Sequence, residues 1–158
     1  MKRESLRVIG IDPTTRGFAY ALIEGPESVA DWGLAQLMIR TDEKVLARIE
    51  EILDRSLPAL LVLGDGRGTR RRARARRIIK GVKGIARQRK LPVVFVSRAR
   101  LKEVFLPAST KQEIAEAIAA RFPELRSRLP RQRKPWQSED ERMSIFDALS
   151  FCFAAIWK

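Results

Sequence analysis

The order of the apolar segments along the chain constrains its fold more than any other feature. Three strand-like runs come first, at residues 6–11, 18–23 and 29–39, and turn-forming residues separate them. Helical and strand-like patterns then alternate, and the chain ends in two helical segments. This order predicts an α/β fold with a mixed five-stranded sheet, in which the first three strands are antiparallel.

The spacing of apolar and capping residues places the later segments. Thr41-Asp42 can cap a helix that ends before Pro58, and the continuous apolar run Leu60–Leu63 predicts a strand buried on both faces. The remaining expected segments are a basic helix at 70–89, a strand at 92–97, a helix capped by Thr110 and Glu113, a loop at 121–135, and a last helix that opens with a capping box at Ser138–Glu141 and runs to Trp157.

Two residue types that many enzymes need are missing or rare. The chain has no histidine, so every mechanism that requires an imidazole base or ligand is excluded. Its single cysteine, Cys152, lies in an apolar stretch, so we expect core packing rather than a disulfide or a zinc site, and a reducing cytoplasm. The apolar runs are too short for a membrane span or a signal-peptide core, and we therefore expect no membrane partner.

Positive charge is concentrated in two segments. The chain has 32 Lys and Arg against 19 Asp and Glu, a formal net charge of +13. Residues 67–90 hold twelve basic residues and no acid, and residues 121–134 hold six against Glu124. So many uncompensated charges repel one another, which predicts contacts with nucleic-acid phosphates. The basic residues that we expect to bind nucleic acid are Arg16, Arg67, Arg70, Arg71, Arg72, Arg74, Arg77, Lys80, Lys83, Arg131, Arg133 and Lys134.

Trp136 follows the second basic segment directly. An aromatic side chain beside a basic cluster is a candidate for stacking on a nucleobase. Packing at the entry to the last helix is the more common role for such a residue. The sequence leaves both roles open.

Three aspartates are candidate site residues because of the elements that surround them. Asp12 follows the first strand and should lie at the carboxyl end of a central strand, where open α/β sheets bind ligands, although an Asx turn before Pro13 is the alternative. Asp65 ends the strand at 60–63, where an ordinary turn residue is the alternative. Asp147 lies inside an apolar helix, so we expect an arginine or a metal ion to pair with it.

Asp140 is a fourth candidate. It precedes Asp147 by seven residues, two helical turns, so both would project from one face of the last helix, with the helix dipole as the alternative role for Asp140. The helix dipole and the capping box account for Glu139 and Glu141. Clustered carboxylates without histidine or cysteine suit Mg²⁺ or Mn²⁺, and two such ions can drive phosphodiester hydrolysis.

Two stretches of the chain resemble motifs of a known family. Residues Val8 to Thr15, followed by Gly17-Phe18-Ala19-Tyr20, resemble the first-strand motif of the RuvC-like Holliday-junction resolvases in the ribonuclease H-like superfamily. Phe146-Asp147-Ala148-Leu149 resembles the Asp-Ala-Leu motif on that family's last helix. The order of elements is similar from about Leu6 to Trp157. The resemblance implies one ribonuclease H-like three-layer domain over 1–158, with helices on both faces of the sheet, in which Asp12 and Asp147 bind metal.

The chain departs from the family pattern at two positions. The glutamate that the family has at the end of the fourth strand corresponds to Asp65, which is one methylene shorter. The family's other carboxylate on the last helix falls on Ser144 or Met143, so Asp140 would have to serve instead.

The resemblance implies an endonuclease that cuts branched DNA in recombination and repair and depends on two Mg²⁺ or Mn²⁺ ions. Asp12, Asp65, Asp140 and Asp147 would be its catalytic metal ligands. A junction requires two symmetric cuts, which implies a two-fold homodimer. Two alternatives are a non-catalytic basic module that binds nucleic acid, and a YqgF-like nuclease that acts on structured RNA.

Overall fold

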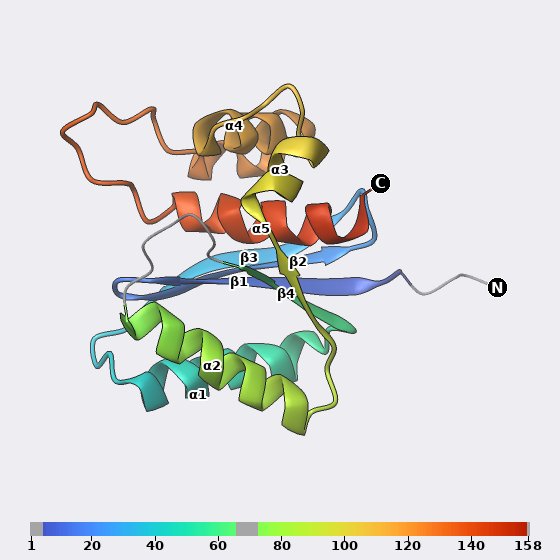
Figure 1. Cartoon of the computed structure of the whole chain (residues 1–158), viewed down its shortest axis with the longest axis vertical. Coiled ribbons are helices and arrows are strands. Elements are labelled where there is room, and N and C mark those ends of the chain that lie inside the picture. The colour runs from blue at the N-terminus through green and yellow to red at the C-terminus, as the bar shows by residue number, and fades with distance from the viewer. Residues whose placement is uncertain (1–4, 66–72, 158) are drawn as a thin grey trace.

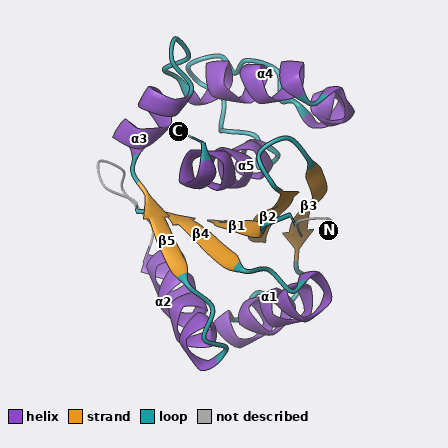
Figure 2. Cartoon of the chain, turned by 90° about the vertical axis from the view of Figure 1, so that its right-hand side faces the viewer, coloured by secondary structure: helices purple, strands orange, loops and turns teal. Residues whose placement is uncertain are grey.

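A mixed sheet of five strands lies between two layers of helices (Figures 1 and 2). The computed structural model describes residues 5–65 and 73–157, so Arg67, Arg70, Arg71 and Arg72 of the expected nucleic-acid contacts lie outside the described residues. The sheet has the order β3-β2-β1-β4-β5. Its strands are β1 (Arg7–Thr14), β2 (Gly17–Glu24), β3 (Val29–Gln36), β4 (Leu60–Gly64) and β5 (Val93–Val96). The first three strands are antiparallel and β4 and β5 run parallel to β1, which confirms the predicted fold class.

The helices cover both faces of this sheet (Figure 2). One layer consists of α1 (Asp42–Ser56) and α2 (Ala73–Gln88). The other consists of α3 (Arg98–Val104), α4 (Lys111–Arg121), the short 3₁₀ helix η1 (Pro123–Arg128) and α5 (Met143–Ile156). In that layer α5 lies against β1 and β2, and α4 packs on the outside of α5. No helix within the described residues is long and apolar enough to cross a membrane.

Alternation along the strands divides the core into two clusters. Ile9 and Ile11 of β1 face the cluster that packs under α1 and α2, whereas Val8 faces the cluster under α5. Successive strand residues point to opposite faces, so Gly10 and Asp12 share the face of Val8. The residues of β1 that precede the candidate site are therefore buried on both sides of the sheet.

Gly10 is the point of closest approach between β1 and α5. A Cβ added at Gly10 would overlap the carbonyl oxygen of Ala148 and would lie 2.9 Å from the sulfur of Cys152. The thiol of Cys152 is buried 3.8 Å from the carbonyl oxygen of Val8, as expected for core packing, and burial raises its pKa. The absence of a side chain at Gly10 thus allows the backbone of α5 to lie directly on β1.

Several element boundaries differ from the sequence-based expectation. β1 continues through Asp12 to Thr14, and the hairpin turn occupies only residues 15–16, because Asp12 pairs with Ala19 in the β1–β2 ladder. Neither α3 nor η1 was expected, since both are too short to show a clear helical period. The capping residue Thr110 is confirmed, because its hydroxyl accepts a hydrogen bond of 3.1 Å from the backbone N–H of Glu113.

Gly10→Ala is expected to destabilise the fold, because the new methyl group would meet backbone that can only yield if α5 moves away from β1. Overpacking of this kind costs roughly 1–3 kcal/mol, and denaturant unfolding followed by circular dichroism measures it. Gly84→Ala in α2 is the matched control. Its Cβ would meet no atom within 4 Å, so it should raise the free energy of unfolding by about 1 kcal/mol. Equal stability of G10A and wild type would show that this contact does not fix α5.

Candidate functional site

The candidate site lies at the carboxyl end of β1, close to the start of α4 and α5 (Figure 1). Asp12 comes from β1, two residues beyond Gly10 on the strand face that looks toward α5. It is a strand residue rather than a residue of the turn that precedes Gly17. Asp147 comes from the first half of α5 and directly precedes Ala148, which contacts Gly10. The packing of α5 on β1 therefore brings the two aspartates to one place.

Lys111 joins these acids. The ammonium of Lys111, the first residue of α4, lies 3.3 Å from the carboxylate of Asp147 and 3.2 Å from that of Glu139. It is also close enough to Asp12 for that carboxylate to raise the pKa of the lysine. Asp147 was expected to have an arginine or a metal ion as its partner, and in this structure the partner is a lysine. We call Asp12, Lys111, Glu139 and Asp147 the carboxylate site.

Burial controls the protonation of this site. The side chain of Asp147 is only 13% exposed, and loss of solvent raises its pKa to about 6, with the charge of Lys111 opposing the rise. Burial alone would lower the pKa of Lys111, but the charges of Asp147 and Glu139 outweigh it and the pKa of Lys111 is raised. The acid is therefore costly to ionise where it stands, and the lysine is held firmly in its charged form.

Asp140 does not lie on the last helix. α5 begins at Met143, so the expectation that Asp140 and Asp147 share one helix face is wrong. The Asp140 carboxylate accepts a 2.9 Å hydrogen bond from the backbone N–H of Arg142 and one of 2.7 Å from its guanidinium. These hydrogen bonds lower the pKa of Asp140 and hold the chain in a turn before the helix. The expected capping box at 138–141 is therefore absent, and α5 has no side-chain cap.

Glu139 is the acid of this loop that reaches the carboxylate site, and sequence analysis assigned it only to the helix dipole. Lys111 lies between the expected capping residues Thr110 and Glu113, and no site role was expected for it. The sequence carried no signal for either contact, because both depend on how the loop enters α5.

Asp65 follows the last residue of β4, and its backbone N–H donates a 3.0 Å hydrogen bond to the carbonyl of Val96. Val62 faces the α5 side of the sheet, and Leu61 and Leu63 face the α1 and α2 side. When the alternation of side chains is continued beyond β4, Asp65 belongs to the same face of the sheet as Leu63, which is the face opposite to that of Asp12. The β4 residue that belongs to the same face as Asp12 is Gly64.

The residues of the carboxylate site fit a divalent ion in kind but not in their present spacing. Carboxylate oxygens are the ligands that Mg²⁺ and Mn²⁺ prefer. Over residues 5–65 and 73–157, however, no three acidic or cysteine side chains stand close enough together to hold a metal ion. The ammonium of Lys111 lies between Asp147 and Glu139. A metal ion can therefore join these acids only if Lys111 moves off Asp147.

Two of the expected nucleic-acid contacts have partners within the protein. Arg74 donates hydrogen bonds to the carbonyl oxygens of Thr15, at 3.0 Å, and of Arg40. Arg77 forms an ion pair of 2.8 Å with Asp42 at the start of α1. These arginines fasten α2 to the β1–β2 turn and to α1, which is a structural role.

The other expected contacts within the described residues lie at the surface. Arg16 is exposed in the β1–β2 turn, Lys80 is exposed on α2, and the ammonium of Lys83 lies 5.6 Å from the ring centre of Phe95. Arg131, Arg133 and Lys134 are exposed on the loop between η1 and α5.

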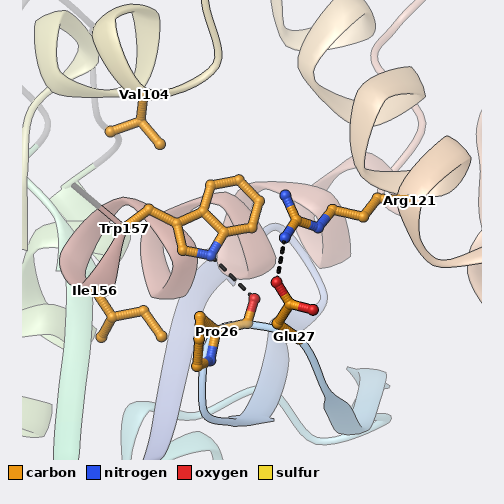
Figure 3. A pocket seen from close by; sticks show the side chains of 6 residues that line it. All are labelled: Pro26, Glu27, Val104, Arg121, Ile156 and Trp157. Carbon is orange, nitrogen blue, oxygen red and sulfur yellow. Dashed lines mark hydrogen bonds and ion pairs between the residues drawn. The ribbon is translucent and has the colours of Figure 1, made fainter.

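A pocket lies at the opposite end of α5 (Figure 3). The indole N–H of Trp157 donates a 3.0 Å hydrogen bond to the carbonyl of Pro26, and Arg121 forms a 3.0 Å ion pair with Glu27. The guanidinium of Arg121 also lies 4.6 Å from the ring centre of Trp157. These contacts join α4 and α5 to the β2–β3 turn, so we assign this pocket a structural role.

Between about pH 4 and pH 6, the titration of Asp147 should lower the free energy of unfolding as the pH rises. Asp147 keeps its proton up to about pH 6 in the folded state but only to about 3.8 when unfolded, so the folded state binds more protons in this range. The difference corresponds to roughly 3 kcal/mol. Asp147→Asn removes this titration, so the free energy of unfolding of wild type minus that of D147N should fall by most of this amount, roughly 2 kcal/mol, from pH 4 to pH 7.

The measurement is denaturant unfolding in a chelator, and Asp140→Asn is the control of opposite sign. The lowered pKa of Asp140 contributes stability above the ordinary pKa of an aspartate, and this stability is lost as the pH falls. Wild type should therefore gain stability relative to D140N as the pH rises. A difference between wild type and D147N that stays flat or grows with pH would contradict the burial of Asp147.

No protein-family model matches the chain, and no curated protein matches it in sequence. Solved structures do match it. Thermus thermophilus RuvC gives a TM-score of 0.67 at 16% identity, covering 94% of this chain and 92% of that one. T. thermophilus RuvC in complex with a Holliday junction substrate gives a TM-score of 0.70 at 15% identity, covering 96% and 94%. The Fowlpox virus resolvase, in complex with substrate Holliday junction DNA, gives a TM-score of 0.53 at 14% identity, covering 97% and 100%.

At these identities the likeness is one of fold. It extends over almost the whole of this chain and of each matched protein. The mixed five-stranded sheet between two helical layers is the architecture that the resemblance in the sequence implied. The chain therefore shares the fold of Thermus thermophilus RuvC and of the Fowlpox virus resolvase.

Proposed function

We propose that this chain is a divalent-metal-dependent endonuclease that hydrolyses phosphodiester bonds in branched DNA. The observation that carries the proposal is the convergence of Asp12, Glu139 and Asp147 on the ammonium of Lys111. This convergence lies at the carboxyl end of a central strand, where α/β sheets place their sites. Two of the matched structures of this fold contain Holliday junction DNA, which favours branched DNA as the substrate.

Asp12 and Asp147 are the proposed ligands of the metal ion. When bound, Mg²⁺ or Mn²⁺ would supply a water activated for attack and a positive charge at the phosphate. Lys111 would then release Asp147 while keeping its contact with Glu139, 3.2 Å away in this structure. From there its ammonium can neutralise negative charge that develops on the phosphate. Glu139 is thus a positioning residue for Lys111.

Asp65 and Asp140 have weaker support as ligands. Asp140 is paired with Arg142, so we propose that Glu139 takes the place in the site that Asp140 was expected to fill. Asp65 would have to turn toward α5 beyond the end of β4 to serve as a further carboxylate. A second ion, as two-metal catalysis requires, depends on that movement.

Exposed basic residues near the carboxylate site are proposed to hold the nucleic-acid backbone. Arg16 lies in the β1–β2 turn, four residues after Asp12, and Arg131, Arg133 and Lys134 lie on the loop that leads to Glu139. Phosphate contacts of this kind position the substrate without reading its sequence. Two symmetric cuts in a junction require two sites, so we propose that the active form is a two-fold dimer.

A second candidate is a basic module that binds nucleic acid without cutting it. The observation that favours it is the ion pair between Lys111 and Asp147, because the lysine already neutralises the acid that a metal ion would need. This candidate predicts tight, salt-sensitive binding and no cleavage in either metal.

The test incubates the purified protein with a four-way DNA junction, DNA duplex, single-stranded DNA and the matching RNAs, each in Mg²⁺, Mn²⁺ or chelator. We expect cleavage of the junction in the presence of metal only. Asp12→Asn and Asp147→Asn should each reduce the cleavage rate by roughly 100-fold or more, because each removes a proposed metal ligand. Binding in a gel-shift assay should be preserved, since neither residue is proposed to grip the backbone.

Asp54→Asn is the matched control, because Asp54 is an exposed acid on α1 whose partner is Arg89, and its cleavage should equal that of wild type. Cleavage retained in both D12N and D147N would remove the proposed mechanism. Binding without cleavage by wild type would establish the non-catalytic candidate. Preferred cleavage of RNA would move the chain to the YqgF-like alternative.

A further inference from the structure

The loop between η1 and α5 presents an aromatic side chain to solvent. Trp136 is 78% exposed, whereas Trp32 and Trp157 are partly buried and pack against the core under α5. Packing at the entry to α5, the more common role predicted for Trp136, is therefore wrong. A large apolar ring left in water by the folded chain is available to a ligand.

The loop holds Trp136 in a defined turn. The backbone N–H of Gln137 donates a 2.9 Å hydrogen bond to the carbonyl of Lys134, and the side-chain oxygen of Gln137 accepts one of 3.0 Å from the Lys134 N–H. The guanidinium of Arg133 donates a further 3.1 Å hydrogen bond to the Gln137 carbonyl. A ligand of the ring therefore has little loop ordering to offset on binding.

Positive charge lies beside the ring. The ammonium of Lys134 lies 5.4 Å from the ring centre of Trp136, and Arg131 and Arg133 are exposed on the same loop. No acid occurs between residues 125 and 138. A ring with cations beside it matches a nucleotide, because the base stacks on the ring and the phosphate meets the cations. An apolar protein surface would gain nothing from these charges.

The loop connects the ring to the carboxylate site. Glu139 is three residues after Trp136 and contacts Lys111, which contacts Asp147. Three residues span at most about 11 Å, so a base on Trp136 lies within about three nucleotides of a phosphate at the carboxylate site. In Figure 1 this loop projects from the same end of the molecule as the β1–β2 turn and the start of α5.

We propose that Trp136 and Lys134 form a nucleobase-stacking site that holds an unstacked base beside the position of cleavage. The inference rests on the proposed function, since it names the part of the substrate that this loop recognises. Inside a continuous duplex both faces of a base are covered by its neighbours, so the ring can stack only where bases are open, as at a branch point or in a single strand. The site therefore favours branched or single-stranded nucleic acid over duplex.

The test measures binding in chelator, where no cleavage occurs, with a DNA junction, a single strand and a continuous duplex. Trp136→Ala should weaken binding of the junction and the single strand by roughly 10-fold, in line with the loss of one base–aromatic stack. Binding of the duplex should change by less than about 2-fold, because phosphate contacts dominate it. Trp136→Phe keeps an aromatic face and should retain most of the wild-type affinity.

Tryptophan fluorescence provides an independent readout. Single-stranded DNA should quench the emission of wild type, and the quenching should disappear in W136F, in which Trp32 and Trp157 remain. Leu6→Ala is the control variant, since Leu6 is exposed at the opposite end of β1 from Asp12, and it should bind all three DNAs as wild type does.

Three results would overturn the inference. They are unchanged binding in W136A, equal weakening for duplex and junction, and quenching that survives in W136F. Each of these leaves the proposed function standing, because metal-dependent cleavage and its loss in D12N and D147N are measured separately. Failure of wild type to bind any nucleic acid would overturn both.

Discussion

The close packing of α5 on β1 is the contact on which the candidate site depends. Gly10 has no side chain, so the carbonyl of Ala148 reaches the strand backbone, and Cys152 fills the space beside it. Asp12 is two residues beyond Gly10 on the same strand face, and Asp147 is the neighbour of Ala148. Two acids that are 135 positions apart in the chain therefore both come near Lys111 because two backbones touch. A larger residue at position 10 would separate them even if both acids were unchanged.

Acids brought together in this way repel one another and lose solvent, and Lys111 offsets both effects. Its ammonium contacts Asp147 and Glu139 and lies near Asp12, so carboxylates from three parts of the chain face its positive charge, and the charge of Arg98 also acts on Asp147. Burial has the largest effect on Asp147, since it raises the pKa of this carboxyl to about 6 while the charges of Lys111 and Arg98 oppose the rise. In the proposed function, a divalent ion would take over the place of the lysine ammonium at Asp147.

The sequence predicted the fold and the two acids that lie in clear strand and helix patterns, but it did not predict which further residues make up the carboxylate site. Asp12 and Asp147 follow from an apolar strand and an apolar helix, which the core fixes in space. Asp65 comes one residue after Gly64, the β4 residue on the same face of the sheet as Asp12. Because successive strand residues point to opposite faces, this shift of one residue gives Asp65 the face opposite to that of Asp12. The choice between Glu139 and Asp140 rests on where α5 begins, and the hydrogen bonds of Arg142 to Asp140 decide that locally. Helix boundaries of this kind are the least predictable part of a sequence pattern.

The two basic segments, which look alike in sequence, have different partners in the folded chain. In the described part of the segment 67–90, Arg74, Arg77 and Arg89 bind carbonyl oxygens or carboxylates of the protein and join α2 to α1 and the β1–β2 turn, whereas Lys80 and Lys83 are exposed. In the loop before α5, Arg131 and Lys134 remain exposed beside Trp136, and the same loop delivers Glu139 to Lys111. A substrate gripped by this loop would pull on the residue that positions Lys111. In the proposed reaction, substrate binding at this loop and the release of Asp147 by Lys111 would therefore be connected through one short piece of chain, which would give the second basic segment the more direct part.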